Sequence, residues 1–142
     1  MKSIASIFPI MLMVFALACK SQDYNHENYP DARIVFGSGG GFTGMVSTYV
    51  LLEDGRIFDK APTSESFSLL KKGKKSTAKA LFLRIAEISQ TNEPINIPGN
   101  IYYFIEWHSP EGEPYRLTWG DMRNPAPEAV TAFYQTLLDA TK

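Results

Sequence analysis

Cysteine and histidine are scarce in this chain of 142 residues, which contains one cysteine and two histidines. A single cysteine excludes an intrachain disulfide, and so few cysteines and histidines exclude the Cys/His zinc frameworks. Charge of one sign is not in excess either, because 14 Lys and Arg face 15 Asp and Glu. A nucleic-acid-binding protein normally carries a basic surplus. We therefore expect no nucleic-acid partner, no metal and no cofactor.

Ser3 to Ala18 is a largely apolar run without a charged residue, and it follows the positively charged start Met1-Lys2. At about 16 residues the run is too short for a comfortable membrane span. A charged start followed by an apolar run of this length is typical of an export signal. The run ends at Cys19, the chain's only cysteine, and polar residues follow.

The pair Ala18-Cys19 resembles the cleavage site of a bacterial lipoprotein signal peptide, in which a small residue precedes a cysteine that receives diacylglycerol. The usual pattern has Leu three positions before the cysteine and a small residue two before, where this chain has Ala16 and Leu17. The resemblance implies that residues 1–18 are removed and that Cys19 carries acyl chains such as palmitate. Ordinary signal cleavage is the alternative, since Ala16-Leu17-Ala18 also fits the small-x-small rule.

Under the lipoprotein interpretation the protein belongs to the cell envelope. Lys20 and Ser21 follow the cysteine in place of the acidic residue that favours inner-membrane retention, which points to the outer membrane, on its periplasmic face or at the cell surface. Residues 19–31 are polar and predict a lipidated, flexible tether. Residues 32–142 predict one domain, which we expect to be monomeric.

The first half of this domain predicts three strands. They cover residues 33–36, 45–52 and 57–58, and the glycine cluster 37–44 separates the first two. Asp54-Gly55 supplies the positive φ angles of a tight hairpin between the second and the third. Residues 60–73 predict a loop, with a short strand at 66–70 as an option.

The second half predicts a helix, a hairpin and a helix. Ser76 or Thr77 can cap the first helix, and Asn92-Glu93-Pro94 ends it. Strands are expected at 101–108 and 115–119. Apolar residues at helical spacing mark the two helices: Ala78, Leu81, Phe82, Ile85 and Ile88, then Val130, Phe133, Tyr134, Leu137 and Leu138. The expected fold is α+β, a single antiparallel sheet of about 4–5 strands with both helices on one face, in the order β-β-β-α-β-β-α.

The strand at 101–108 is aromatic on both faces. Tyr102 and Phe104 alternate with Tyr103 and Trp107. With both helices on one face, the other face either presents an aromatic surface to a partner or is covered by the tether or a loop. Trp107 is therefore a candidate partner-binding residue.

The segment Gly39 to Val46 fits the pattern G-x-G-x-x-G-x-V of phosphate-covering loops. A strand follows it, and the chain lacks a kinase catalytic loop, so a dinucleotide or kinase fold is contradicted. The structural interpretation is a hairpin connection that needs positive φ. The functional interpretation is a binding loop, because Phe42 among the glycines is an apolar tip that a partner pocket could accept.

Two further groups of side chains are candidates for a functional role. Glu106, His108 and Asp121 are the only acid–base candidates and would favour a small hydrolase if they converged around a pocket. The cluster Lys71, Lys72, Lys74, Lys75 and Lys79 indicates a solvated surface, with contact to phospholipid or lipopolysaccharide as the sharper alternative.

Two resemblances bear on function. The stretches Phe36 to Gly44 and Pro98 to Phe104 are similar to those of small uncharacterised Bacteroidota-type lipoproteins, which bring no known activity. Gly40-Gly41-Phe42-Thr43-Gly44 more distantly resembles the strand-and-turn opening of the emfourin family, which implies inhibition of a thermolysin-like metallopeptidase through this loop. The leading hypothesis is a non-enzymatic, lipid-anchored envelope module that binds a protein or peptide through the glycine loop (Gly40 to Gly44) and the adjacent aromatic sheet surface that includes Trp107. A structural envelope accessory without a ligand of its own is the alternative.

Overall fold

The computed structural model describes residues 29–142, so the export signal, Cys19 and most of the tether lie outside the described residues. Within this part of the chain seven strands and two helices follow one another. They are β1 (Arg33–Gly40), β2 (Val46–Leu52), β3 (Arg56–Lys60), β4 (Ser68–Lys72), α1 (Lys75–Thr91), β5 (Ile95–Ile97), β6 (Ile101–His108), β7 (Tyr115–Trp119) and α2 (Glu128–Ala140).

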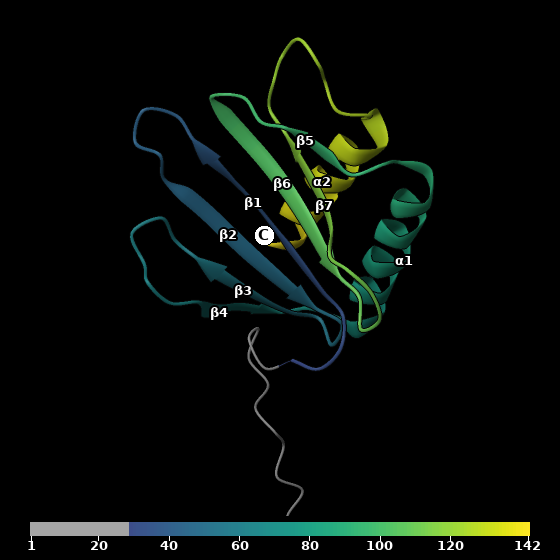
Figure 1. Cartoon of the computed structure of the whole chain (residues 1–142). Helices are drawn as coiled ribbons and strands as arrows, with labels where there is room; N and C mark the ends of the chain where they lie inside the picture. Colours follow the sequence, from purple (N-terminus) through teal and green to yellow (C-terminus); the bar gives the residue numbers. More distant parts are fainter. Residues whose placement is uncertain (1–28) are drawn as a thin grey trace, which may run out of the picture.

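The strands form one sheet in the order β4-β3-β2-β1-β6-β7-β5 (Figure 1). All neighbours are antiparallel except β5 and β7, which run parallel. The predicted α+β class and the single sheet are confirmed. The predicted number of strands is wrong, as is the purely antiparallel pairing. The placement of the helices in the chain also differs, because α1 follows a fourth strand and β5 intervenes between α1 and β6.

One face of the sheet packs against both helices. Ile34 and Phe36 of β1 and Ile105 of β6 are fully buried there. The helix residues in the same cluster are Ala78, Leu81, Phe82, Ile85 and Ile88 of α1 and Val130, Phe133, Tyr134 and Leu137 of α2. These are the apolar positions that the 3.6-residue spacing marks in the sequence, and Leu138 lies at their edge, partly buried.

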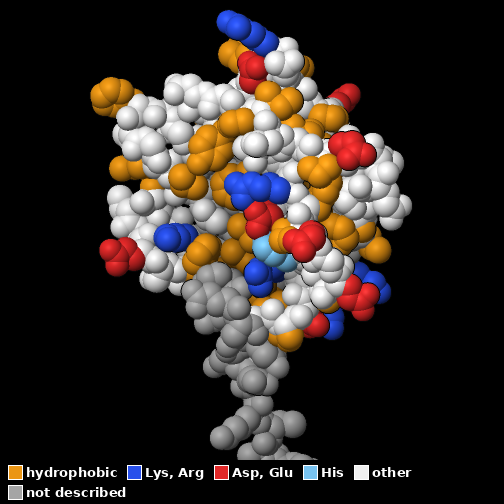
Figure 2. Space-filling model, viewed as in Figure 1, with side chains coloured by type: hydrophobic (Ala, Val, Ile, Leu, Met, Phe, Trp, Pro, Cys, Tyr) orange, Lys and Arg blue, Asp and Glu red, His pale blue; other side chains and the backbone are white. Residues whose placement is uncertain are grey.

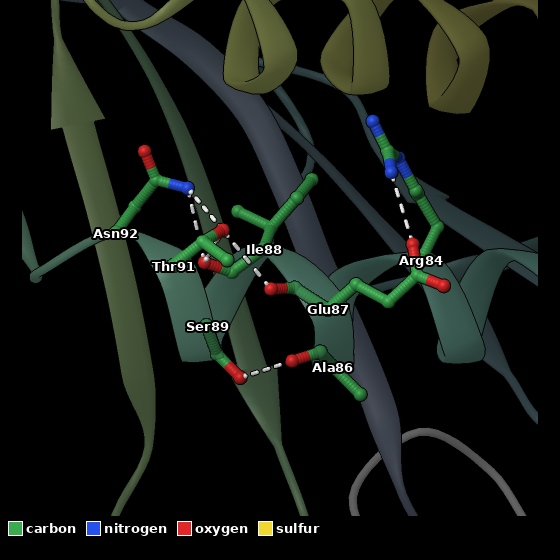
Figure 3. A network of polar contacts seen from close by, with 7 residues as sticks. All are labelled: Arg84, Ala86, Glu87, Ile88, Ser89, Thr91 and Asn92. Atoms are coloured by element: carbon green, nitrogen blue, oxygen red, sulfur yellow. Dashed lines mark hydrogen bonds and ion pairs between the residues drawn. The ribbon is translucent and has the colours of Figure 1, made fainter.

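The two ends of α1 differ in how their backbone groups are satisfied. The helix begins at Lys75 after Lys74, and no side chain caps it, so the predicted cap at Ser76 or Thr77 is wrong. At the other end the Asn92 amide donates to the carbonyl of Ile88 at 3.1 Å, among other side-chain bonds shown in Figure 3. The last helical residue is therefore Thr91, and Asn92 is the C-cap, as the pattern Asn92-Glu93-Pro94 predicts.

Strand β1 runs on through the glycines to Gly40, so the predicted strand end at Phe36 is wrong. In the register Phe104 of β6 lies opposite Gly37 and Tyr102 opposite Gly39. A Cβ at Gly39 would fall 2.8 Å from the Tyr102 ring carbon Cζ. Aromatic rings thus occupy the space that side chains on β1 would fill, which keeps a glycine-rich strand in the centre of the sheet.

The helix-free face is shown in Figure 2, where hydrophobic side chains surround a small group of charged ones. Val50, Leu52 and Phe58 form a second buried cluster on this face. Tyr29 and Phe67 pack against it. The chain just before β1 and the β3–β4 connection therefore cover one part of this face, which is the alternative the sequence left open.

Candidate functional site

The β1–β2 connection is a glycine turn with a defined backbone. Gly40, Gly41 and Gly44 have φ angles of 93°, 74° and 63°, which side chains rarely adopt. The Gly41 N–H donates to the carbonyl of Asn100 at 2.7 Å, and the Gly44 N–H donates to that of Gly41 at 3.2 Å. The glycines thus have a structural role, and they also determine where Phe42 and Thr43 stand.

Phe42 at the tip of this turn is entirely exposed, with a relative accessibility of 107%. Thr43 beside it is exposed as well, and Met45 at the end of the turn is 48% exposed. An aromatic ring that loses no water contact on folding adds nothing to the hydrophobic stabilisation of the domain. Its position at the tip of a glycine turn held by backbone hydrogen bonds is typical of a residue that contacts a partner.

Two other loops lie at the same end of the sheet, the turn before β6 and the connection that follows β7 (Figure 1). Ile101, the first residue of β6, pairs with Gly40 beside the glycine turn, and Ile101, Tyr103 and Met122 at this end of the sheet are 54%, 38% and 96% exposed. Ile101, Tyr103 and Met122 line a hollow of about 540 Å³ together with the polar residues Asn100, Asp121 and Arg123. We call Phe42, Met45, Ile101, Tyr103 and Met122 the loop-end surface.

Tyr103 is held by an aromatic cluster below the loop-end surface. Its ring lies 5.5 Å from Tyr134 and 5.9 Å from Trp119, measured between centroids. The Tyr134 hydroxyl donates to the carbonyl of Gly37 at 3.0 Å. Burial raises the pKa of Tyr134 to about 12, so this hydroxyl keeps its proton at neutral pH. The cluster therefore gives the loop-end surface a rigid base joined to both α2 and β1.

Trp107, the other predicted contact residue, does not lie at this end. It pairs with Ile34 in the sheet, whereas the glycine turn begins beyond Gly40, opposite Ile101. Six residues of strand separate the two places, a distance of about 20 Å. Trp107 is half-buried against the core and lines a separate hollow of about 430 Å³ with Lys75 and Lys79. The prediction that Trp107 and the glycine turn share one surface is wrong.

The acid–base candidates are also divided between two places. Glu106 accepts hydrogen bonds from Nε2 of His108 and Nη1 of Arg116, each at 2.5 Å. Asp121 lies beyond β7 at the loop end, where the backbone N–H of Arg123 and the amide of Asn124 hold the pKa of its carboxyl below the usual value. Because Asp121 and His108 lie near opposite ends of β6, the three side chains do not form one site.

Sequence reasoning found Phe42 but missed Ile101, Tyr103 and Met122. Their signal was present in part, since Met122 is an apolar residue in a polar connection and Ile101 follows the Pro-Gly-Asn turn. Between residues 29 and 142 no acidic, His or Cys side chains gather in a group of three that could hold a metal ion. No helix in that range is long and apolar enough to cross a membrane. In comparisons with known proteins, the chain matches no family model and no curated protein.

Proposed function

We propose that this protein is a lipid-anchored, non-enzymatic binding module of the cell envelope, and that its loop-end surface binds a protein or peptide. The observation that carries the proposal is the full exposure of Phe42 on a turn whose backbone is held by glycines and by the Asn100 carbonyl. Four further exposed apolar side chains lie at the same end of the sheet, and three of them, Ile101, Tyr103 and Met122, line one hollow. Clustered exposed apolar groups of this kind mark interaction sites on soluble domains.

Binding would proceed without chemistry on the partner. The Phe42 ring enters an apolar pocket, and the short side chains beside it let backbone N–H and C=O groups of the turn approach an extended chain. Ile101 and Met122 then exclude water at the rim of the contact, as the residues around an anchor do. Little ordering cost arises on this side, because the turn is already bonded to the neighbouring strand.

The most concrete form of this function is inhibition of a peptidase. The resemblance of Gly40 to Gly44 to the emfourin family suggests a thermolysin-like metallopeptidase as the partner. Such an enzyme binds peptide substrates in a cleft, where an apolar subsite could take the Phe42 ring and the cleft backbone could pair with the turn. The outer-membrane location proposed for the anchor would place the inhibitor where exported peptidases act.

Phe42→Ala is expected to weaken inhibition of a thermolysin-type metallopeptidase by about fivefold to a thousandfold, because an aromatic anchor typically contributes about 1 to 4 kcal/mol to binding. The assay uses the chain from Asp23 to Lys142, which contains every buried core residue of the described structure. The inhibition constant is measured against a peptide substrate. Folding of the variant is checked by circular dichroism.

Leu83→Ala is the matched control, since Leu83 is 60% exposed on α1, an element outside the loop-end surface. It should inhibit as the unaltered chain does. Equal inhibition by the Phe42 variant and the unaltered chain would remove the glycine turn as the contact. Absence of inhibition at tens of micromolar by the unaltered chain would remove the peptidase from the proposal and leave the loop-end surface without this partner.

Anchoring is tested separately. In bacteria expressing the full chain, a radiolabelled fatty acid should be incorporated into the protein, and Cys19→Ser should abolish the label because the thiol is the acyl acceptor in the proposed site. The unlabelled variant should also leave the membrane fraction when the membranes are washed at high salt, which screens any charge-based contact. Ser21→Ala, two positions away, should keep both the label and the location. A full chain that carries no label would show that ordinary signal cleavage occurs instead.

A further inference from the structure

The chain enters the domain at the end of the sheet opposite the loop-end surface. Ala32 leads directly into β1, whose first residue Arg33 pairs with Leu52 and His108 at the far ends of their strands. The loop-end surface begins where β1 finishes, at Gly40. Figure 1 shows the start of β1 and the three loops at opposite ends of the sheet. We call the end that holds Ala32 the tether end.

The lysines of the sequence cluster lie at the tether end as well. Lys72 closes β4 opposite Arg56, and α1 starts at Lys75, so the junction between β4 and α1 sits beside the start of β3. Residues 71–79 contain no acidic side chain. We define the lysine patch as four exposed residues of this junction and the first turns of α1: Lys72, Lys74, Lys75 and Lys79.

The fold itself does not account for the lysine patch. Positive side chains at a helix N-terminus oppose the helix dipole, and α1 has neither an acidic residue in its first turn nor a side-chain cap. Lys71 differs from the others, because its Nζ donates to the carbonyl of Ala140 at the end of α2, where a positive charge is favourable. The charges of Lys74 and Lys75 at the start of α1 thus oppose its dipole.

Most carboxylates of the tether end lie on the β2–β3 and β6–β7 connections, and not on the junction between β4 and α1. Asp54 is paired with Arg56 at 2.8 Å, and Glu53 lies near Lys75. Glu111 and Glu113 belong to the β6–β7 hairpin. The charge of this end is therefore divided, with the basic part on the side of β4 and α1.

We propose that the lysine patch lies against anionic lipid headgroups and turns the side of the tether end formed by β4 and α1 toward the bilayer. This inference rests on the proposed anchor at Cys19 for the membrane it concerns. The segment from Cys19 to Tyr29 spans at most about 35 Å when fully extended, so the domain stays close enough to the bilayer for the lysine patch to reach it. Close to an anionic surface each lysine contributes favourably to the free energy of membrane binding, and these contributions add. The loop-end surface then faces away from the membrane, toward the partner.

The test measures binding of the chain from Asp23 to Lys142 to vesicles of phosphatidylcholine with and without phosphatidylglycerol, by co-sedimentation. Because Cys19 is absent, the result does not depend on lipidation or on any peptidase. We expect binding only to the vesicles that contain phosphatidylglycerol, and a loss of binding as salt shortens the screening length from about 30 Å at 0.01 M to about 10 Å at 0.1 M. Replacing Lys72, Lys74 and Lys75 by glutamine should reduce this binding about tenfold or more.

The control variant removes the same number of charges elsewhere, with Lys60, Arg84 and Arg123 replaced by glutamine. These residues lie at the end of β3, within α1 and in the connection after β7, away from the lysine patch. The control should bind the anionic vesicles nearly as the unaltered chain does. Equal losses of vesicle binding in the two variants would show that only net charge matters. Equal binding to vesicles with and without phosphatidylglycerol would show that the patch does not contact anionic headgroups. Either result overturns the inference and leaves the Phe42 test unaffected.

Discussion

Replacing Phe36 by alanine is expected to lower the free energy of unfolding by about 3 to 5 kcal/mol, the usual cost of truncating a fully buried aromatic ring. Phe36 has no exposed surface, and its ring stacks on Tyr49 with centroids 5.3 Å apart. It lies on β1, which has strands on both sides, so the cavity cannot close without moving the centre of the sheet. Urea unfolding followed by circular dichroism measures the change.

Leu83→Ala again provides the comparison, because the same kind of truncation at a side chain 60% exposed removes few contacts. We expect a change of less than about 1 kcal/mol there. A similar small change at Phe36 would contradict the placement of β1 at the centre of the core.

Replacing Gly37 by alanine should also destabilise the domain, by about 3 kcal/mol. The added Cβ would lie 2.0 Å from the carbonyl oxygen of Ser47 and 3.0 Å from Cζ of Phe104. Ser47 contributes a backbone atom of β2, so relief requires β1 and β2 to separate. Intrinsic residue preference alone would predict that this substitution stabilises the domain, since alanine is favoured over glycine inside a strand by about 0.5 to 1 kcal/mol.

Gly39→Ala, two positions along the same strand, is the matched control. Its Cβ would meet the Tyr102 hydroxyl oxygen at 2.7 Å and a methyl group of Val46 at 2.9 Å, which are ends of side chains and can move. We expect a smaller loss, largely recovered when Tyr102 is replaced by alanine in the same chain. Equal losses at Gly37 and Gly39 would show that strand chemistry, and not the backbone contact with Ser47, sets the cost. Thermal unfolding of the three variants decides between these outcomes.

The helices and the second hairpin could be predicted because their patterns are long and one-sided. The apolar spacing in α1 names the five residues that the structure buries. The predicted strands 101–108 and 115–119 match β6 and β7 in both bounds. In each case one face packs against the core, and apolar residues recur at the spacing of that element, about 3.6 residues in a helix and 2 in a strand.

Two elements lack such a face: β4, which the sequence offers only as an optional strand at 66–70, and β5, which was not predicted. Every residue of β4 is exposed, and its lysines suit the edge of a sheet, so no alternation marks it as a strand. Strand β5 has three residues and directly follows Glu93-Pro94. The glycines of β1 have no side chains to form a pattern, and what holds them in the sheet are Phe104 and Tyr102 of a strand distant in the sequence.

The candidate site was predictable only where one segment forms it. Phe42 is an apolar residue among glycines and could be found locally. Alternation assigned Trp107 to a face of its strand, but the distance of Trp107 from the glycine turn depends on the register between β1 and β6. The same register brings Ile101 beside the turn, and no local pattern contains that information.

The central position of β1 has a consequence for when the domain can form. Arg33 needs His108 as a neighbour, and Gly37 needs the hydroxyl of Tyr134, so the earliest described strand is completed by segments synthesised last. Contacts so distant in sequence make folding slow and nearly all-or-none. A nascent chain therefore stays unfolded until almost the whole of it is available, a property that would suit the export proposed for this chain.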